Sequence, residues 1–248
     1  MALPFGLSGG AAAFLLAAVL IAAILRGFSG FGFSALVVAA SGLVSDPLNA
    51  VAVVLFCEVV MTLQAARGIA GHVDWRRVGF LLAGAAIGLP IGVHGLIAIG
   101  LDAARVAISV FILAMCLVLL AGATIAREVR GWPNAVLGLA SGVANGAAMA
   151  GLPVAAFFSA QPIPPRVFRA TLIAYFAVLD LLTLPVLFHA GLITRDTYVA
   201  CAVALPLLLI GNHFGSFRFA KSAPQGFRRL AIALLAVLAV LGLLKSGL

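Results

Sequence analysis

Long apolar stretches without charge recur along the whole chain, and they limit its fold more than any other feature. Hydrophobic residues make up 65% of the 248 residues and charged residues only 9%, whereas soluble domains contain roughly a quarter charged residues. A helix needs about 20 apolar residues to cross a bilayer. The sequence therefore predicts an all-α polytopic protein of the lipid bilayer. The apolar segments are 8–25, 35–44, 48–66, 78–99, 106–125, 135–150, 154–160, 167–190, 198–217 and 230–244.

Two of these segments, 35–44 and 154–160, are too short to cross a membrane alone. Glycine and proline adjoin both of them. The sequence Gly151-Leu152-Pro153 interrupts the chain before 154–160, and a proline-rich turn follows at 161–165. Each short segment is expected to return to the side from which the chain came, as one half of a broken-helix hairpin.

The basic residues predict the orientation in the membrane. Eleven of the 15 Lys and Arg residues flank four loops, near 67–77, 127–130, 166–169 and 218–229. Positive charge marks cytoplasmic loops, so both termini are expected on the outer, periplasmic side of a bacterial inner membrane. No basic segment contains interleaved aromatic residues, and the sequence therefore predicts no nucleic-acid partner.

The order of features repeats in the two halves. Ser29-Gly30 corresponds to Ser141-Gly142, and Gly88-x-x-x-Gly92 corresponds to Gly211-x-x-x-Gly215. We expect a first repeat at 1–126 and a second at 131–248, inverted relative to each other within one integral membrane domain. Each repeat would hold one broken hairpin and three transmembrane helices, a pattern typical of secondary transporters. The alternative is chance similarity between glycine-rich apolar segments.

The glycine-rich stretches resemble those of the TauE/SafE sulfite exporter family, also called the 4-toluene sulfonate uptake permease family. RGFSGFGFSALVVA resembles the first motif, GLASGVANGAAMAGLPVAAFF resembles the second, and PPRVFRATLIAYF and GNHFGSFRF are also similar. Two departures are Gly32-Phe33-Ser34, where the family often has three glycines, and Leu152-Pro153, where Gly-Pro is common. The resemblance implies a carrier of a small anion such as sulfite, an organosulfonate or another organic anion.

The glycine-rich breaks are the predicted anion site. An unwound backbone inside the bilayer must be buried in protein or line a polar cavity, and the second half of a broken helix begins with unpaired N–H groups that favour an anion. Two such tips facing each other would hold the substrate near the midplane, and close helix packing is the alternative role of the glycines. The predicted substrate-binding residues are Arg26, Ser29, Gly30, Phe31, Gly32, Ser34, Ser141, Asn145, Gly146, Met149 and Gly151.

Charged and histidine residues within the apolar segments are further candidates, because such residues usually pair or serve function. Arg26 would contact the substrate or extend to the headgroups. Glu58 and Asp180, at corresponding positions of the two halves, would carry coupling protons or pair with arginines. Arg169 would guard the cytoplasmic mouth or anchor a helix end. His94 and His213 would carry protons or pack through hydrogen bonds.

Two other classes of function are alternatives to a carrier. Gly27-Phe28-Ser29-Gly30 resembles the nucleophile stretch of rhomboid proteases, with His94 or His213 as the base. A membrane assembly factor without transport is the second alternative. The sequence has no Walker motif, and the spacing of Cys57, Cys116 and Cys201 fits no metal site. We expect a carrier rather than an enzyme, without cofactor or metal; the direction of transport and a homodimer stay open.

Overall fold

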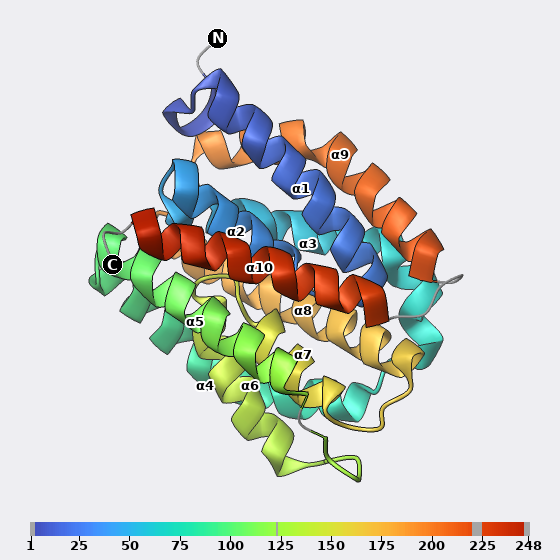
Figure 1. Cartoon of the computed structure of the whole chain (residues 1–248). Coiled ribbons are helices and arrows are strands. Elements are labelled where there is room, and N and C mark those ends of the chain that lie inside the picture. Colours follow the sequence, from blue (N-terminus) through green and yellow to red (C-terminus); the bar gives the residue numbers. More distant parts are fainter. Residues whose placement is uncertain (1–2, 123, 220–224, 246–248) are drawn as a thin grey trace.

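The computed structural model describes residues 3–122, 124–219 and 225–245, and α-helices form most of this part of the chain (Figure 1). Among the described residues, six helices are long and apolar enough to cross a membrane, namely α1, α3, α4, α5, α8 and α9. The prediction of an all-α polytopic membrane protein is thus confirmed. The helices are α1 (Gly9–Ser29), α2 (Phe33–Val44), α3 (Pro47–Ile69), α4 (Trp75–Ala98), α5 (Leu101–Ala121), α6 (Trp132–Asn145), α7 (Gly151–Ser159), α8 (Pro165–His189), α9 (Arg195–Phe219) and α10 (Gln225–Lys245), with single 3-10 turns η1 (Pro4–Gly6) and η2 (Ala70–His72).

Local sequence explains several helix ends. The Asp46 side chain accepts a hydrogen bond from the Leu48 N–H at 2.9 Å, and Pro47 opens α3 where no amide hydrogen is needed. Asp74 accepts from the Arg77 N–H at 3.1 Å and begins α4 in the same way. Gly122, with φ +63°, ends α5 in the left-handed conformation that favours glycine.

Two pairs of consecutive helices are the broken hairpins. The first turns between α1 and α2 at Gly30–Gly32, where the sequence predicted a break. The second break lies at 146–150 rather than at 151–153, so this boundary was predicted too late. α7 already begins at Gly151, because Pro153 falls in its first turn, where a missing N–H costs no hydrogen bond.

Close helix packing links segments far apart in the sequence. α1 packs along α9, α4 along α6, α3 against α8, and α5 against α10. Glycines make the closest approaches: Gly88 and Gly92 of α4 abut the α6 backbone, and Gly211 and Gly215 of α9 abut that of α1. The equivalent glycine motifs thus serve equivalent contacts. These contacts support the inverted-repeat prediction. The inversion and the repeat bounds at 1–126 and 131–248 stay predictions.

Both ends of the described chain lie at one end of the bundle, which we call the terminal end (Figure 1). The Phe5 N–H donates to Asp196, at the start of α9, at 2.7 Å. Arg105, in the first turn and a half of α5, donates to the Ser45 carbonyl just after α2 at 3.0 Å. Because α10 runs antiparallel to α5, its final turns also reach this end.

The opposite end, which we call the basic end, holds the connections at 70–74, 124–131 and 160–164. The Asp74 N–H donates to Thr171, near the start of α8, at 3.0 Å. The Val129 N–H donates to Gln161 at 2.7 Å, which joins two of these connections. The arginine-flanked loops within the described residues therefore gather on one side, as the charge pattern predicts. Which side of the bilayer each end faces stays a prediction, and Lys221 lies outside the described residues.

Candidate functional site

The two hairpin tips meet inside the bundle. Phe31 of the first tip lies close to Gly151 of the second, whose Cβ, if present, would be 3.7 Å from the Phe31 Cβ. Between the tips is a cavity of about 10 Å³, which we call the tip cavity. A cavity of this size holds about one water molecule. Its lining includes Gly32, Ser34, Asn145, Met149 and Gly151 from the predicted substrate-binding set, and Glu58 and Asp180 from the predicted coupling set.

The backbone of both tips departs from helical geometry. Gly30 and Gly32 have φ +86° and +94°, which L side chains rarely adopt. In the second tip the positive φ, +56°, belongs to Ala148, at a cost of about 1–2 kcal/mol. Gly146 has φ −53° and instead lets α6 lie directly on the backbone of Gly92.

Arg26 sits in the last turn of α1 and is fully buried. Its Nη2 donates to Thr62 Oγ1 at 2.8 Å and to the Glu58 carbonyl at 3.4 Å, and its Nε lies 3.9 Å from Glu58 Oε2. The side chain therefore does not extend to the headgroups. Among the described residues, no group hydrogen-bonds Nη1, so a guanidinium with five N–H donors keeps unused donors within the bundle.

Glu58 of α3 reaches the start of α2. Its Oε1 accepts from the Ser34 hydroxyl at 2.5 Å and from the Ser34 N–H at 3.4 Å. A helix N-terminus favours a negative group through its unpaired amides and its dipole. The carboxylate of Glu58 thus occupies the position at the first tip that the sequence analysis assigned to a bound anion.

A separate hydrogen-bond network fixes the second tip. Asn145 Nδ2 donates to Thr183 Oγ1 at 2.8 Å. The Tyr175 hydroxyl donates to Ser141 Oγ at 2.9 Å, and Ser141 in turn donates to the Ala150 carbonyl at 2.9 Å. Ser141 therefore holds the backbone of the second tip through Ala150 and does not line the tip cavity.

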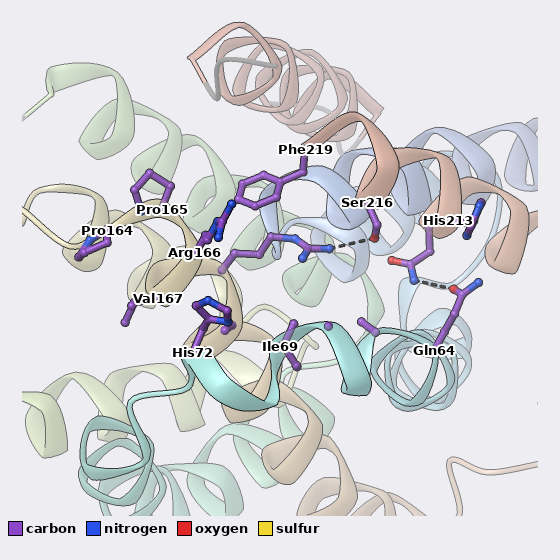
Figure 2. A pocket seen from close by; sticks show the side chains of 15 residues that line it. Gln64, Ile69, His72, Pro164, Pro165, Arg166, Val167, His213, Ser216 and Phe219 are labelled. Atoms are coloured by element: carbon purple, nitrogen blue, oxygen red, sulfur yellow. Dashed lines mark hydrogen bonds between the residues drawn. The ribbon is translucent and has the colours of Figure 1, made fainter. Parts of the chain in front are cut away.

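A larger pocket opens at the basic end, and we call it the vestibule (Figure 2). It has a volume of about 840 Å³ and is formed by α3, η2, α8, α9 and Pro164, which precedes α8. In Figure 2 the side chains of Gln64, His72, Arg166, His213 and Ser216 surround this space. Its basic lining would attract anions from the adjacent water.

Arg169 links the vestibule to the first tip. Its guanidinium donates to the Gly27 carbonyl at 2.6 and 3.1 Å and to Ser216 Oγ at 2.9 Å. It also lies 4.9 Å from the centre of the Phe219 ring. The Gly27 carbonyl belongs to the last turn of α1, so Arg169 caps that helix and ties α1, α8 and α9 together.

The remaining predicted residues lie beside the tip cavity or away from it. The Ser29 hydroxyl lies within hydrogen-bond distance of two carbonyls, those of Leu25 and Phe31, and Gly30 packs against Arg169. His94 is exposed, its Nδ1 donates to the Pro90 carbonyl at 2.8 Å, and it lines neither pocket. His213 lines the vestibule.

Tyr175, Ser216 and four further neutral polar residues take part in these networks without having been singled out from the sequence. Thr62 and Thr183 bond Arg26 and Asn145, as described above, and Asn212 Nδ2 donates to Gln64 Oε1 at 2.6 Å in the lining of the vestibule. The signal available for them was the one used for Ser34 and Asn145, a polar side chain within an apolar segment. In the part of the chain that the structure describes, no three His, Cys, Asp or Glu residues gather as metal ligands.

Comparison with known proteins places this geometry in a family. The family model for the sulfite exporter TauE/SafE matches residues 15–242. No curated protein and no solved structure matches the chain. The family match covers both hairpins, the vestibule and the helices that frame them, and the chain therefore belongs to the TauE/SafE sulfite exporter family.

Proposed function

We propose that the protein is a secondary carrier of a small sulfur oxyanion or organosulfonate, which it moves by alternating access through the tip cavity. Membership of a family of membrane transporters supports the general activity. The observation on which the location of the site depends is that two hairpin tips from distant parts of the sequence meet at a buried polar cavity. Inverted hairpins that meet at the midplane are how many secondary transporters form their sites.

The electrostatics of the tips suit an anion. Arg26 keeps unused N–H donors inside the bundle, and the starts of α2 and α7 both border the tip cavity. Each helix start adds a positive dipole end and unpaired amide groups. An anion entering this region would compete with the Glu58 carboxylate for Ser34 and Arg26. We infer that Glu58 holds the site together between transport cycles and yields these donors to the substrate.

The volumes of the two pockets suggest how the cycle proceeds. The vestibule, at about 840 Å³, is large enough for a hydrated anion, whereas the tip cavity, at about 10 Å³, is too small for sulfite. Admission of substrate therefore requires the tips to move apart. Arg169 is the proposed gate, because release of its bonds to Gly27 and Ser216 would separate α8 from α1 and α9.

The alternative functions find less support. Among the described residues, Ser29 Oγ hydrogen-bonds backbone groups and no histidine, which argues against a protease nucleophile. A polar cavity at the centre of the bundle has no purpose in a scaffold. We therefore favour the carrier over both the protease and the assembly factor.

The test is uptake of radiolabelled sulfite and methanesulfonate into liposomes that contain the purified protein. We expect saturable uptake of at least one of the two anions. Replacing both members of the buried pair, Arg26→Gln with Glu58→Gln, should raise the apparent substrate constant about 10- to 100-fold, as expected for the loss of charged hydrogen bonds. Arg67→Gln is the matched control, because Arg67 is an exposed arginine at the end of α3. Uptake no faster than in empty liposomes would contradict the proposal.

A further inference from the structure

One buried arginine and two buried carboxylates lie together beside the tip cavity. Arg26, Glu58 and Asp180 are 0%, 4% and 2% exposed, respectively. If all three were ionised, the cluster would have a net charge of −1 in the centre of a membrane protein. An uncompensated buried charge is among the most costly features that a protein can contain. The cluster is neutral if one carboxyl group carries a proton.

The two carboxylates are compensated very differently. Glu58 has the Arg26 guanidinium at 3.9 Å, the hydroxyl and N–H of Ser34, and the start of α2. Asp180 lines the same cavity with the neutral Asn145 amide beside it, and its Oδ2 has no hydrogen-bond partner among the described residues. The compensation favours an ionised Glu58 and leaves Asp180 as the group that takes the proton.

Several other charged or titratable groups on the helices around Asp180 have partners of their own. On α8 itself, the Tyr175 hydroxyl donates to Ser141, and Arg169 is bound to Gly27 and Ser216. On α4, Arg77 pairs with Asp74 and Glu128, and His94 bonds the Pro90 carbonyl. Neither α2 nor α7 contains a titratable residue, and α6 contributes the neutral amide of Asn145. Glu58 and Arg26 are the charged groups that act on Asp180 within the cluster.

We propose that Asp180 is the proton-binding residue of the carrier and that it takes up one proton with each substrate anion. This inference rests on the proposed function. An ionised carboxylate is only an acceptor and would repel an anion at the tips, whereas a protonated one donates an O–H hydrogen bond to it. The proton adds to Oδ2 from the water on the side where the anion enters, and it leaves to water with the anion on the other side. Anion and proton thereby raise each other's affinity by the same factor.

A proton fits this site better than a metal cation. The tip cavity, at about 10 Å³, holds about one water-sized body and has no room for a cation with its remaining waters. The positive start of α2 and the guanidinium of Arg26 also disfavour a free cation at this place. A proton bound covalently to Asp180 avoids both difficulties.

The experiment follows protons and anion together in liposomes loaded with a pH-sensitive dye. Methanesulfonate is the main probe, because it stays a monovalent anion across the pH range used, and sulfite is the second. We expect uptake to acidify the interior, and an acidic exterior to speed uptake by up to about tenfold per pH unit below saturation. Asp180→Asn should retain slower, measurable anion exchange that moves no protons and ignores pH. Asp102→Asn, a change at an exposed acid of the terminal end, should behave as the natural protein does.

The outcomes separate this inference from the proposed function. Absence of flux for both anions contradicts the proposed function and this inference with it. Anion flux in the natural protein without proton movement, or with a requirement for sodium instead, overturns the role of Asp180 and leaves the carrier intact. Retention of the pH response in Asp180→Asn, with its loss in Glu58→Gln, also overturns the assignment. If Asp180→Asn does not fold, the arm on the natural protein still decides whether a proton accompanies the anion, and Glu58→Gln still tests whether the other carboxyl group carries it.

Discussion

At the scale of single residues, the pair formed by Arg26 and Glu58 has both a structural and a functional role, and stability measurements separate the two. Arg26→Gln removes the charge that compensates the carboxylate of Glu58. Glu58 is only 4% exposed. Breaking a buried pair in this way typically costs about 3–5 kcal/mol. We expect the free energy of unfolding in detergent, measured by denaturant titration, to fall by about that amount.

The double variant supplies the control. When Glu58→Gln accompanies Arg26→Gln, no charge is left unpaired, and most of the lost stability should return. Transport should stay impaired, since the anion has lost its guanidinium partner. If the double variant is no more stable than Arg26→Gln alone, the two side chains do not compensate each other as the 3.9 Å approach indicates.

How far the sequence could predict these residues depends on how unusual each one is. Arg26, Glu58 and Asp180 are charged residues inside apolar segments, a costly feature that is visible without a structure. Thr62 and Asn212 are neutral, and such residues are common in helices for local reasons. Glu58 reaches the start of α2 because of how α3 is rotated about its own axis. A uniformly apolar segment has no periodicity from which that rotation could be predicted.

At the scale of helices, α4 contains a matched set of glycines that tests close packing. A Cβ at Gly88 would meet the backbone of α6 at Leu139 and Val143, whereas a Cβ at Gly79 or Gly95 would meet nothing within 4 Å. Gly88→Ala should therefore separate two helices and lower the unfolding temperature. Gly79→Ala and Gly95→Ala should leave it unchanged or raise it, because alanine is more favourable in a helix by roughly 0.5–1 kcal/mol.

The three glycines lie in one helix of one protein, so the comparison does not mix effects from different helices. All three substitutions add the same methyl group, so only the neighbouring backbone distinguishes them. Thermal unfolding of the three purified variants in detergent gives the result. Equal unfolding temperatures would mean that α4 and α6 do not lie as close as the structure places them.

Helix existence could be predicted from the sequence better than the exact turns could. The break at Gly30–Gly32 was recognised from its glycines, which are the residues with positive φ there. In the second hairpin the positive φ belongs to Ala148, while Gly146, the first residue after α6, keeps a helical φ of −53° and contacts Gly92. Glycine serves both turns and close packing, so its presence alone does not say which of the two a position needs.

At the scale of the whole molecule, the paired contacts connect the proposed gate to both hairpins. α1 ends at the first tip and packs along α9, and α6 ends at the second tip and packs along α4. Arg169 fastens α8 to α1 and α9 at the basic end. A movement that opens the vestibule toward the tips must therefore shift α8 relative to the α1–α9 pair, while the glycine contacts keep each pair intact.

If substrate passes through the vestibule, filling that space should stop transport. Ala65 of α3 lines the vestibule, while Leu63, on the same helix, is 71% exposed and lies outside its lining. In a background with Cys57, Cys116 and Cys201 replaced by alanine, we would introduce Ala65→Cys or Leu63→Cys and treat each with maleimides of increasing size. The thioether formed is not displaced by sulfite, which keeps the label in place during the assay.

The two positions should respond oppositely. At Ala65→Cys, uptake should fall with the size of the maleimide and cease for the bulkiest, because the adduct fills a space of about 840 Å³ in steps. At Leu63→Cys, whose side chain lies on the outer surface of α3, labelling should leave uptake unchanged at every size. Full uptake by Ala65→Cys after complete labelling with the bulkiest reagent would show that the anion takes another route. The tips would then have to be reached between the helices at the terminal end, where Arg105 joins α5 to the end of α2.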